Sequence, residues 1–273
     1  MPPPTRPAMS SPSPLPALRE PVPGSPAAAL RSDLSALYAL AQDSRHVFAS
    51  PIGPFEVAGQ AAVLPRFVFF GPHASDDSWR LAFLAGFDHR DLRASRALVA
   101  LATRLSGDSE TGHALNLTLF PLVDVSGLLS GASGRDLAGA SWSRPASPEI
   151  GLLAQDSRQR AYHGFVRIET AASGEDRITL RIRGAFADEL APGLALISPE
   201  ETGSLPVRFE AAAVAAPQDG PLSLAKGLPV APFELTVRIP ATWSEPEYQS
   251  AAVVLLERFL RRYRAFQAYS QHL

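Results

Sequence analysis

Residues 81–91, with the sequence LAFLAGFDHRD, decide the fold expected for this chain. The segment from Leu81 to Gly86 is apolar almost throughout, which is typical of a strand buried on both faces of a sheet. The turn before it, residues 71–77, is rich in residues that break regular structure. The segment after it, Asp91 to Leu105, places apolar residues at helical spacing. The stretch therefore predicts a buried strand that ends in a polar loop and leads into a helix.

Strand and helix patterns alternate in the same way over most of the chain. Further strands are expected at Ala114–Val123, Phe165–Glu169 and Phe233–Ile239. Further helices are expected from a cap at Ser32-Asp33, from Pro148, and from Glu245 to about Tyr269. This order favours the α/β class, with a mostly parallel sheet covered by helices on both faces. Ligands of such sheets bind at the carboxyl ends of the strands, so the residues that end each strand carry the functional question.

Composition excludes several kinds of site. The 273 residues contain no cysteine, which excludes thiolate zinc sites, cysteine nucleophiles and disulfides. A metal would have to be held by the six histidines and the carboxylates. The net charge is -2 and no run is strongly basic, so we expect no nucleic-acid partner. No apolar run approaches the ~18 residues of a membrane span, and we expect no membrane partner.

The chain is expected to hold one domain. Residues 1–29 are rich in proline, serine and alanine and should form an extended arm, and residues 30–273 should form a single α/β domain. The start of the sequence lacks the charged residues and continuous apolar core of a signal peptide, so a cytoplasmic location is expected.

The end of the first buried strand resembles a motif of the zinc carboxypeptidases. After Gly86 the sequence continues Phe87-Asp88-His89-Arg90-Asp91 and enters the predicted helix. In that family a similar strand is followed by an apolar residue and then His-Gly-Asp-Glu, whose His and Glu bind zinc. Asp88 and Asp91 stand at those two positions.

The next strand ends and loops extend the resemblance. Phe120 to Gly127 is similar to the family's strand ending in Asn-Pro-Asp-Gly, with only the Gly kept. Residues 134–139 resemble the loop Gly-x-Asp-Leu-Asn-Arg, whose last two residues grip the terminal carboxylate of the substrate. Ala138 and Gly139 occupy those two positions.

Two later strands complete the match, which runs roughly from Val57 to Tyr263. The segment ending at Glu169 resembles the strand that supplies the last zinc ligand, and Glu169 takes the place of its histidine. The segment 232–240 resembles the closing strand, with Arg238 where the family has its general-base glutamate. The resemblance implies a three-layer α/β/α fold with a mixed, mostly parallel central sheet.

The same substitutions imply that the family's chemistry is lost. Asp88, Asp91 and Glu169 offer only oxygen, whereas catalytic zinc normally has imidazole among its ligands. The guanidinium of Arg238 cannot act as a base. We therefore expect a non-catalytic homologue without zinc. It would bind an unknown small-molecule, peptide or protein ligand in the former active-site cleft.

Two metal alternatives stay open. The carboxylates Asp88, Asp91 and Glu169 would suit Mg²⁺ or Ca²⁺, which would allow a divergent metal-dependent hydrolase, either a carboxypeptidase or an amide-cleaving enzyme. His89 lies between the two aspartates, but a one-residue slip at a strand end turns a side chain away, so it is not expected to be a ligand. Without a metal the carboxylates need another cation, and Arg238 is expected within ~4 Å of one of them.

Overall fold

The computed structural model describes residues 24–75, 78–132, 136–185, 187–190, 207–211 and 219–270. The helices are α1 (Pro26–Asp43), α2 (Arg93–Gly107), α3 (Val125–Ser130), α4 (Pro148–Arg160) and α6 (Glu245–Ser270), with the short 3-10 helices η1 (Ser109–Gly112) and η2 (Pro221–Gly227). The strands are β1 (Val47–Ala49), β2 (Ile52–Val57), β3 (Gln60–Leu64), β4 (Phe67–Phe70), β5 (Arg80–Leu84), β6 (Asn116–Phe120), β7 (Gly164–Thr170), β8 (Ile178–Gly184), β9 (Val207–Ala211) and β10 (Phe233–Ile239).

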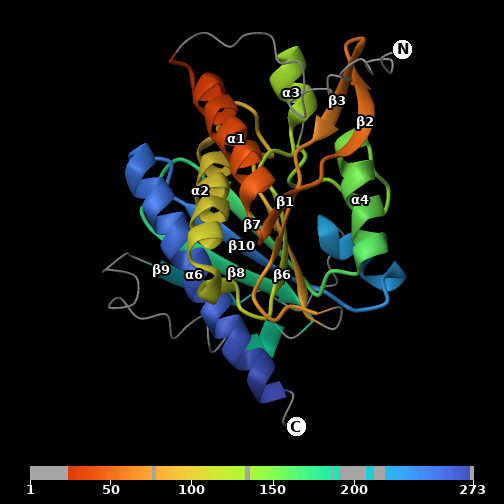
Figure 1. Ribbon diagram of the computed structural model, residues 1–273. Coiled ribbons are helices and arrows are strands. Elements are labelled where there is room, and N and C mark those ends of the chain that lie inside the picture. Colours follow the sequence, from red (N-terminus) through yellow and green to blue (C-terminus); the bar gives the residue numbers. More distant parts are fainter. Residues whose placement is uncertain are drawn as a thin grey trace, which may run out of the picture.

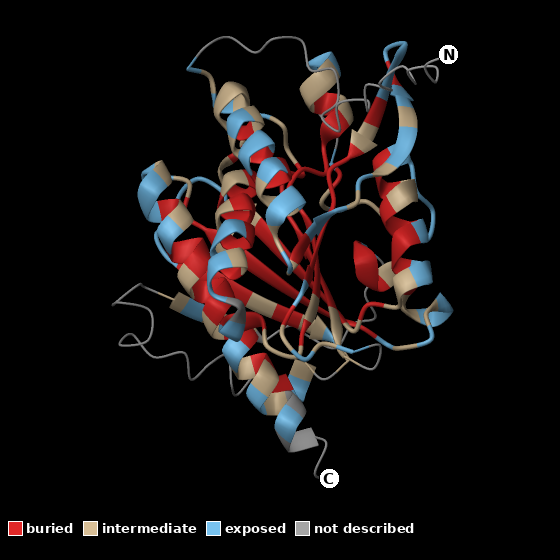
Figure 2. Ribbon diagram, viewed as in Figure 1, coloured by how far each residue is buried: buried red, intermediate tan, exposed pale blue. Residues whose placement is uncertain are grey.

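The fold has three layers. The central sheet has eight strands in the order β1-β4-β6-β5-β7-β10-β8-β9, and β2 and β3 form a separate hairpin. Helices α1, α2 and α6 lie together on one side of the sheet, and α3 and α4 lie on the other (Figure 1). Buried residues concentrate on the strands and on the helix faces turned toward them (Figure 2). The predicted three-layer α/β/α architecture with a mixed sheet is confirmed.

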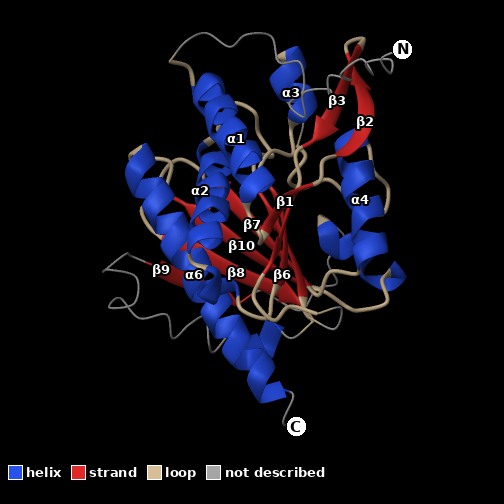
Figure 3. Cartoon of the chain, in the orientation of Figure 1, coloured by secondary structure: helices blue, strands red, loops and turns tan. Residues whose placement is uncertain are grey.

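The centre of the sheet is parallel. Strands β6, β5, β7 and β10 pair side by side in the same direction, and β4 and β8 flank them in the opposite direction. The residues that follow the carboxyl ends of the four parallel strands therefore gather at one edge of the sheet. Figure 3 shows the loops that leave the strands at this edge.

Several expected boundaries were wrong. Helix α1 begins at Pro26, ahead of the expected cap at Ser32-Asp33 and inside the segment expected to be an arm, because the Ser25 hydroxyl accepts a hydrogen bond from the Ala28 amide and Pro26 suits the first turn. Residues 1–23 lie outside the described residues. Strand β6 is shorter than the expected segment 114–123, since residues beyond Phe120 form the loop that leads to α3.

Strands β8 and β9 were not expected at all. In β8, the apolar residues Ile178, Leu180 and Ile182 alternate with polar ones, so the strand contains no continuous apolar run. Alternation of this kind is typical of a strand with one buried face. Among the described helices, none is long and apolar enough to cross a membrane. The cytoplasmic location stays a prediction.

Gly86 makes the turn that leaves β5, and its replacement should be costly. Its φ is +69°, and a Cβ atom there would lie 2.4 Å from the Ser95 hydroxyl and 3.0 Å from the Leu122 Cα. Gly59, in the turn between β2 and β3, also has a positive φ, +78°, but a Cβ there meets nothing within 4 Å. We expect Gly86→Ala to lower the free energy of unfolding by about 1–3 kcal/mol more than Gly59→Ala, as measured by urea denaturation. Equal losses would show that the crowding at Gly86 has no cost.

Candidate functional site: a charged cleft at the strand ends

One face of the sheet is polar where β7, β10 and β8 lie side by side. The register places residues across the three strands in rows, and laterally paired residues share a face. One row holds Glu169, Arg238 and Thr179, the next holds Arg167, Thr236 and Arg181, and the third holds Phe165, Glu234 and Arg183. The opposite face of these strands carries Val, Ile and Leu side chains, which are buried. The charges therefore gather on a single face.

Ion pairs link the charges of this polar face into a chain. Glu234 is fully buried, with Arg167 Nη1 2.8 Å from its Oε1 and Arg183 Nη2 2.7 Å from its Oε2. Arg183 also donates to Asp219, and the other end of the Arg167 guanidinium donates to Glu169. Burial lowers the pKa of Arg167, but Glu169 and Glu234 outweigh it and raise the pKa above its usual value. Arg167 is thus a permanent cation beneath the cleft.

The three carboxylates predicted for the former zinc-ligand positions line one cleft of about 790 Å³. They are Asp88, Asp91 and Glu169, and each is paired with an arginine two residues away in sequence. Arg90 contacts both oxygens of Asp88, with Nε 2.9 Å from Oδ1 and Nη2 2.8 Å from Oδ2. Arg93 holds Asp91 in the same way at 2.9 and 2.7 Å, and Arg167 pairs with Glu169.

These arginines also set the protonation of the two aspartates. The hydrogen bond from Arg90 lowers the pKa of Asp88. Burial raises the pKa of Asp91, but hydrogen bonds from Arg93 and Thr170 outweigh it, so that this pKa is also lowered. Both side chains are therefore carboxylates at neutral pH.

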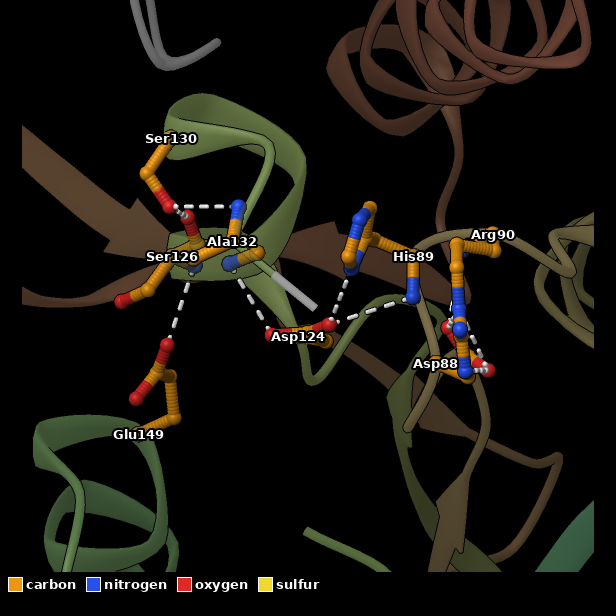
Figure 4. A network of polar contacts seen from close by, with 9 residues as sticks. Asp88, His89, Arg90, Asp124, Ser126, Ser130, Ala132 and Glu149 are labelled. Atoms are coloured by element: carbon orange, nitrogen blue, oxygen red, sulfur yellow. Dashed lines mark hydrogen bonds and ion pairs between the residues drawn. The ribbon is translucent and has the colours of Figure 1, made fainter. Parts of the chain in front are cut away.

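A fourth carboxylate, Asp124, lies beside this group. Figure 4 shows the ring of His89 and the carboxylate of Asp124 turned toward each other, with 2.7 Å between Nδ1 and Oδ2. Asp124 is buried and also accepts hydrogen bonds from the amides of His89 and Gly127, the latter as the cap of α3. A Cβ at position 127 would lie 2.2 Å from Oδ2 of Asp124, so the contact requires glycine there.

Asp88, His89 and Asp124 form the one group of potential metal ligands found among the described residues. One ligand atom from each lies within 4.8 Å of the others. An imidazole with carboxylates is a donor set that zinc accepts. A carboxylate hydrogen-bonded to one ring nitrogen is also the usual support for a histidine that binds metal through the other. The residues fit a metal on condition that Arg90 releases Asp88.

Ala138 and Gly139, which take the positions of the family's two substrate-binding residues, lie in or beside the cleft. Ala138 lines the 790 Å³ cleft and a smaller adjoining pocket of about 250 Å³. Gly139 lines only the smaller pocket, and its amide donates to Asp136. Neither residue has a side chain that can bind a carboxylate.

Comparison with known proteins identifies the fold. No protein-family model matches the sequence, and no curated protein matches it either. The metallo-carboxypeptidase of Burkholderia cenocepacia matches with a TM-score of 0.64 at 13% identity, over 85% of this chain and 68% of that one. The chain has the metallo-carboxypeptidase fold.

Two further solved structures agree. The metallo-carboxypeptidase of Pseudomonas aeruginosa, solved with (2-guanidinoethylmercapto)succinic acid, matches at TM-score 0.61 and 14% identity, over 86% of this chain and 69% of that one. Thrombin activatable fibrinolysis inhibitor matches at TM-score 0.61 and 12% identity, over 86% and 73%. The resemblance to the zinc carboxypeptidases is thus confirmed at the level of the fold.

The expectation that the chain has no cofactor was wrong. Its structural neighbours are metallo-enzymes by name, and the Asp88, His89 and Asp124 group offers metal ligands, one of them an imidazole. His89 was not expected to be a metal ligand, because a one-residue slip at a strand end turns a side chain away. Asp124 was not predicted as a site residue, because the loop after β6 departs from the family's pattern. An aspartate shortly before a glycine at a strand end could have indicated it.

Arg238 lies where it was expected but is less buried. Its Nε is 3.4 Å from Oε2 of Glu169, which confirms the expected approach to a carboxylate. Its side chain is 40% exposed, however, whereas that of Arg167 is 8% exposed. Arg167, rather than Arg238, is the cation that balances the buried carboxylates.

This difference predicts unequal costs for two matched substitutions. We expect Arg167→Met to destabilise the fold by about 3–5 kcal/mol, because it leaves buried Glu234 with one partner. We expect Arg238→Met to cost less than about 1 kcal/mol, as is usual for an exposed ion pair. Chemical denaturation of both variants measures the losses. A larger loss for Arg238→Met would mean that Arg238 holds the site together.

Proposed function

We propose that this chain binds a ligand in the cleft without hydrolysing it, and that the ligand carries an anionic group. Three features support a binding role. Arg238 stands where the zinc carboxypeptidases have a general base, Ala138 and Gly139 offer no grip on a terminal carboxylate, and the cleft carboxylates already have arginine partners. A protein built this way keeps the cleft but lacks the groups that peptide hydrolysis would use.

The proposal for an anionic ligand rests on the Arg181 side chain, which has no partner among the described residues. Arg181 lies on the polar face opposite Thr236, and its side chain forms no ion pair or hydrogen bond with another residue that the structure describes. Its neighbours Arg167, Arg183 and Arg238 all have carboxylate partners. Arg181 therefore has the guanidinium donors that an incoming carboxylate or phosphate can accept from in a bidentate manner.

The position of Arg181 relates it to the larger cleft. The pocket of about 250 Å³ is lined by Arg181 with the other three arginines, and it shares Asp136, Ala138 and Glu169 with the 790 Å³ cleft. A ligand that places its acidic group at Arg181 can extend past Glu169 toward Asp88 and Asp91. A small molecule or short peptide, acidic at one end and polar or cationic at the other, suits this distribution of charge.

Short peptides test the proposal. An N-acetyl dipeptide with a free terminal carboxylate and the same dipeptide with a terminal carboxamide would be titrated into the full chain by calorimetry, and each sample would then be assayed for cleavage. We expect the peptide with the free carboxylate to bind more tightly and to stay intact. Arg181→Gln should weaken its binding about tenfold, the usual value of one hydrogen bond to a charged group.

The control is Arg45→Gln, which removes an exposed arginine near β1, on the opposite side of the sheet order from β8. It should leave the affinity unchanged. Equal affinity for the two peptides, or an equal loss of affinity in both variants, would show that Arg181 does not bind the anionic group. Cleavage of the peptide by the purified chain would refute the non-catalytic role.

A second candidate function is metal-dependent hydrolysis. The observation in its favour is the Asp88, His89 and Asp124 group, which includes an imidazole and so differs from the oxygen-only site expected from the sequence. A divalent metal held there would polarise a bound carbonyl and activate water. The chain's own part would be to hold His89 in place through Asp124 and to give up the Arg90–Asp88 pair.

Zinc binding separates this candidate from the first. We expect His89→Ala to lower zinc affinity at least tenfold, as is typical when a ligand or its support is lost. His46→Ala is the matched control, because His46 is bound to the Phe70 carbonyl outside the cleft. Equilibrium dialysis with elemental analysis gives the readout. Unchanged zinc affinity in His89→Ala would exclude this site, and zinc-dependent cleavage of the dipeptides would favour hydrolysis over the binding role.

A further inference from the structure

A second pocket lies at the opposite end of the parallel strands, away from the cleft. It has a volume of about 570 Å³ and lies where β5 and β6 begin, beside the last turns of α6. Its polar lining residues are His73, Ser75, Ser78, His113, Arg261 and Arg264. None of them belongs to the charged cleft, so any ligand of this pocket would be additional to the one proposed above.

The two histidines are held by a cross-linked pair of loops. His73 and Ala114 both have a φ of +59°, a conformation that non-glycine residues seldom adopt. The Ala114 amide donates to the carbonyl of Pro72 at 2.8 Å, which ties the two loops together. The rings of His73 and His113 lie 4.9 Å apart, centre to centre. The backbone thus brings two imidazoles from separate loops to one place.

Helix α6 adds two arginines to the imidazoles. Arg261 and Arg264 are three residues apart and so lie on one side of the helix. Arg264 is anchored by a hydrogen bond of 2.5 Å to the carbonyl of Glu110. Arg261 is exposed and forms no ion pair with another described residue.

The described lining contains no carboxylate. Asp76 and Asp77 stand between the two serines in the sequence but lie outside the described residues. The two guanidiniums carry a fixed positive charge, and the two imidazoles and two hydroxyls can each donate a hydrogen bond. Donors of this kind suit an anion with several acceptor oxygens.

We propose that this pocket binds a doubly charged oxyanion of the phosphate or sulfate type, as the free ion or as the end of a small ester. Three or four acceptor oxygens on one centre match donors that converge from two loops and a helix. The ring of Trp79 packs against His163 and Tyr263 and forms an apolar wall on one side of the pocket. A monoester has room there for the carbon group it carries.

Sulfate, inorganic phosphate and glycerol phosphate test the proposal by calorimetric titration of the full chain at constant ionic strength. The Arg181→Gln chain is titrated as well, so that binding in the cleft is separated from binding in this pocket. We expect one sulfate to bind in this pocket, both in the unaltered chain and in the Arg181→Gln chain. Arg261→Gln and His113→Gln should each weaken that event about tenfold, the value of one charge-assisted hydrogen bond.

Arg158→Gln serves as control, because Arg158 is an exposed arginine that does not line this pocket and belongs to α4, which lies on the other side of the sheet from α6 (Figure 1). Its affinity for sulfate should equal that of the unaltered chain. Absence of sulfate and phosphate binding, or an equal loss in the control, would overturn the proposal. Tighter binding of glycerol phosphate than of phosphate would assign the pocket to an ester, and the reverse would assign it to the free ion. Loss of binding in Arg181→Gln alone would place the anion in the cleft and refute this pocket.

Discussion

The buried carboxylate of Glu234 constrains how strands β7, β10 and β8 pair in the sheet. A buried ion without a partner costs several kcal/mol, so Glu234 depends on the guanidiniums of Arg167 and Arg183. These come from β7 and β8, the two strands that flank β10. A slip of one strand by one residue would turn that strand's charge toward the apolar face that packs under α6, so the ion pairs also fix the register of the three strands.

The cleft repeats the same arrangement on a smaller scale. A metal centre uses one cation to balance several carboxylates, whereas here Asp88, Asp91 and Glu169 each have an arginine two residues away. This local pairing leaves the carboxylates balanced whether or not a ligand is present. It also explains why Arg181, which has no such partner among the described residues, stands out on the polar face.

The sequence was informative where burial is complete and ambiguous where it is partial. The apolar run of β5 and the mostly apolar β6 predicted buried strands, and the residues after β5 and β7 did line a common cleft. Strands β7 and β10 alternate apolar and polar residues, and they were found also because they resemble strands of the zinc carboxypeptidases. Strand β8 alternates in the same way but lies outside the quoted motifs, so it was missed together with Arg181 and Arg183. The contact of His89 with Asp124 depends on the turn at Gly86 and on the cap of α3, and no hydrophobic period encodes either.

The cations of the polar face and of the cleft are all arginines, and Lys226 is the chain's only lysine. A guanidinium keeps its proton throughout the range in which proteins stay folded, so the basic half of each pair does not titrate. Only the carboxylates can change charge, and they do so as the solution becomes acidic. Because the pKa values of Asp88 and Asp91 are lowered, these two carboxylates become protonated only at a lower pH than an ordinary aspartate. Acidification therefore has one direction of effect on this surface: it makes the surface more positive and strengthens its attraction for anions.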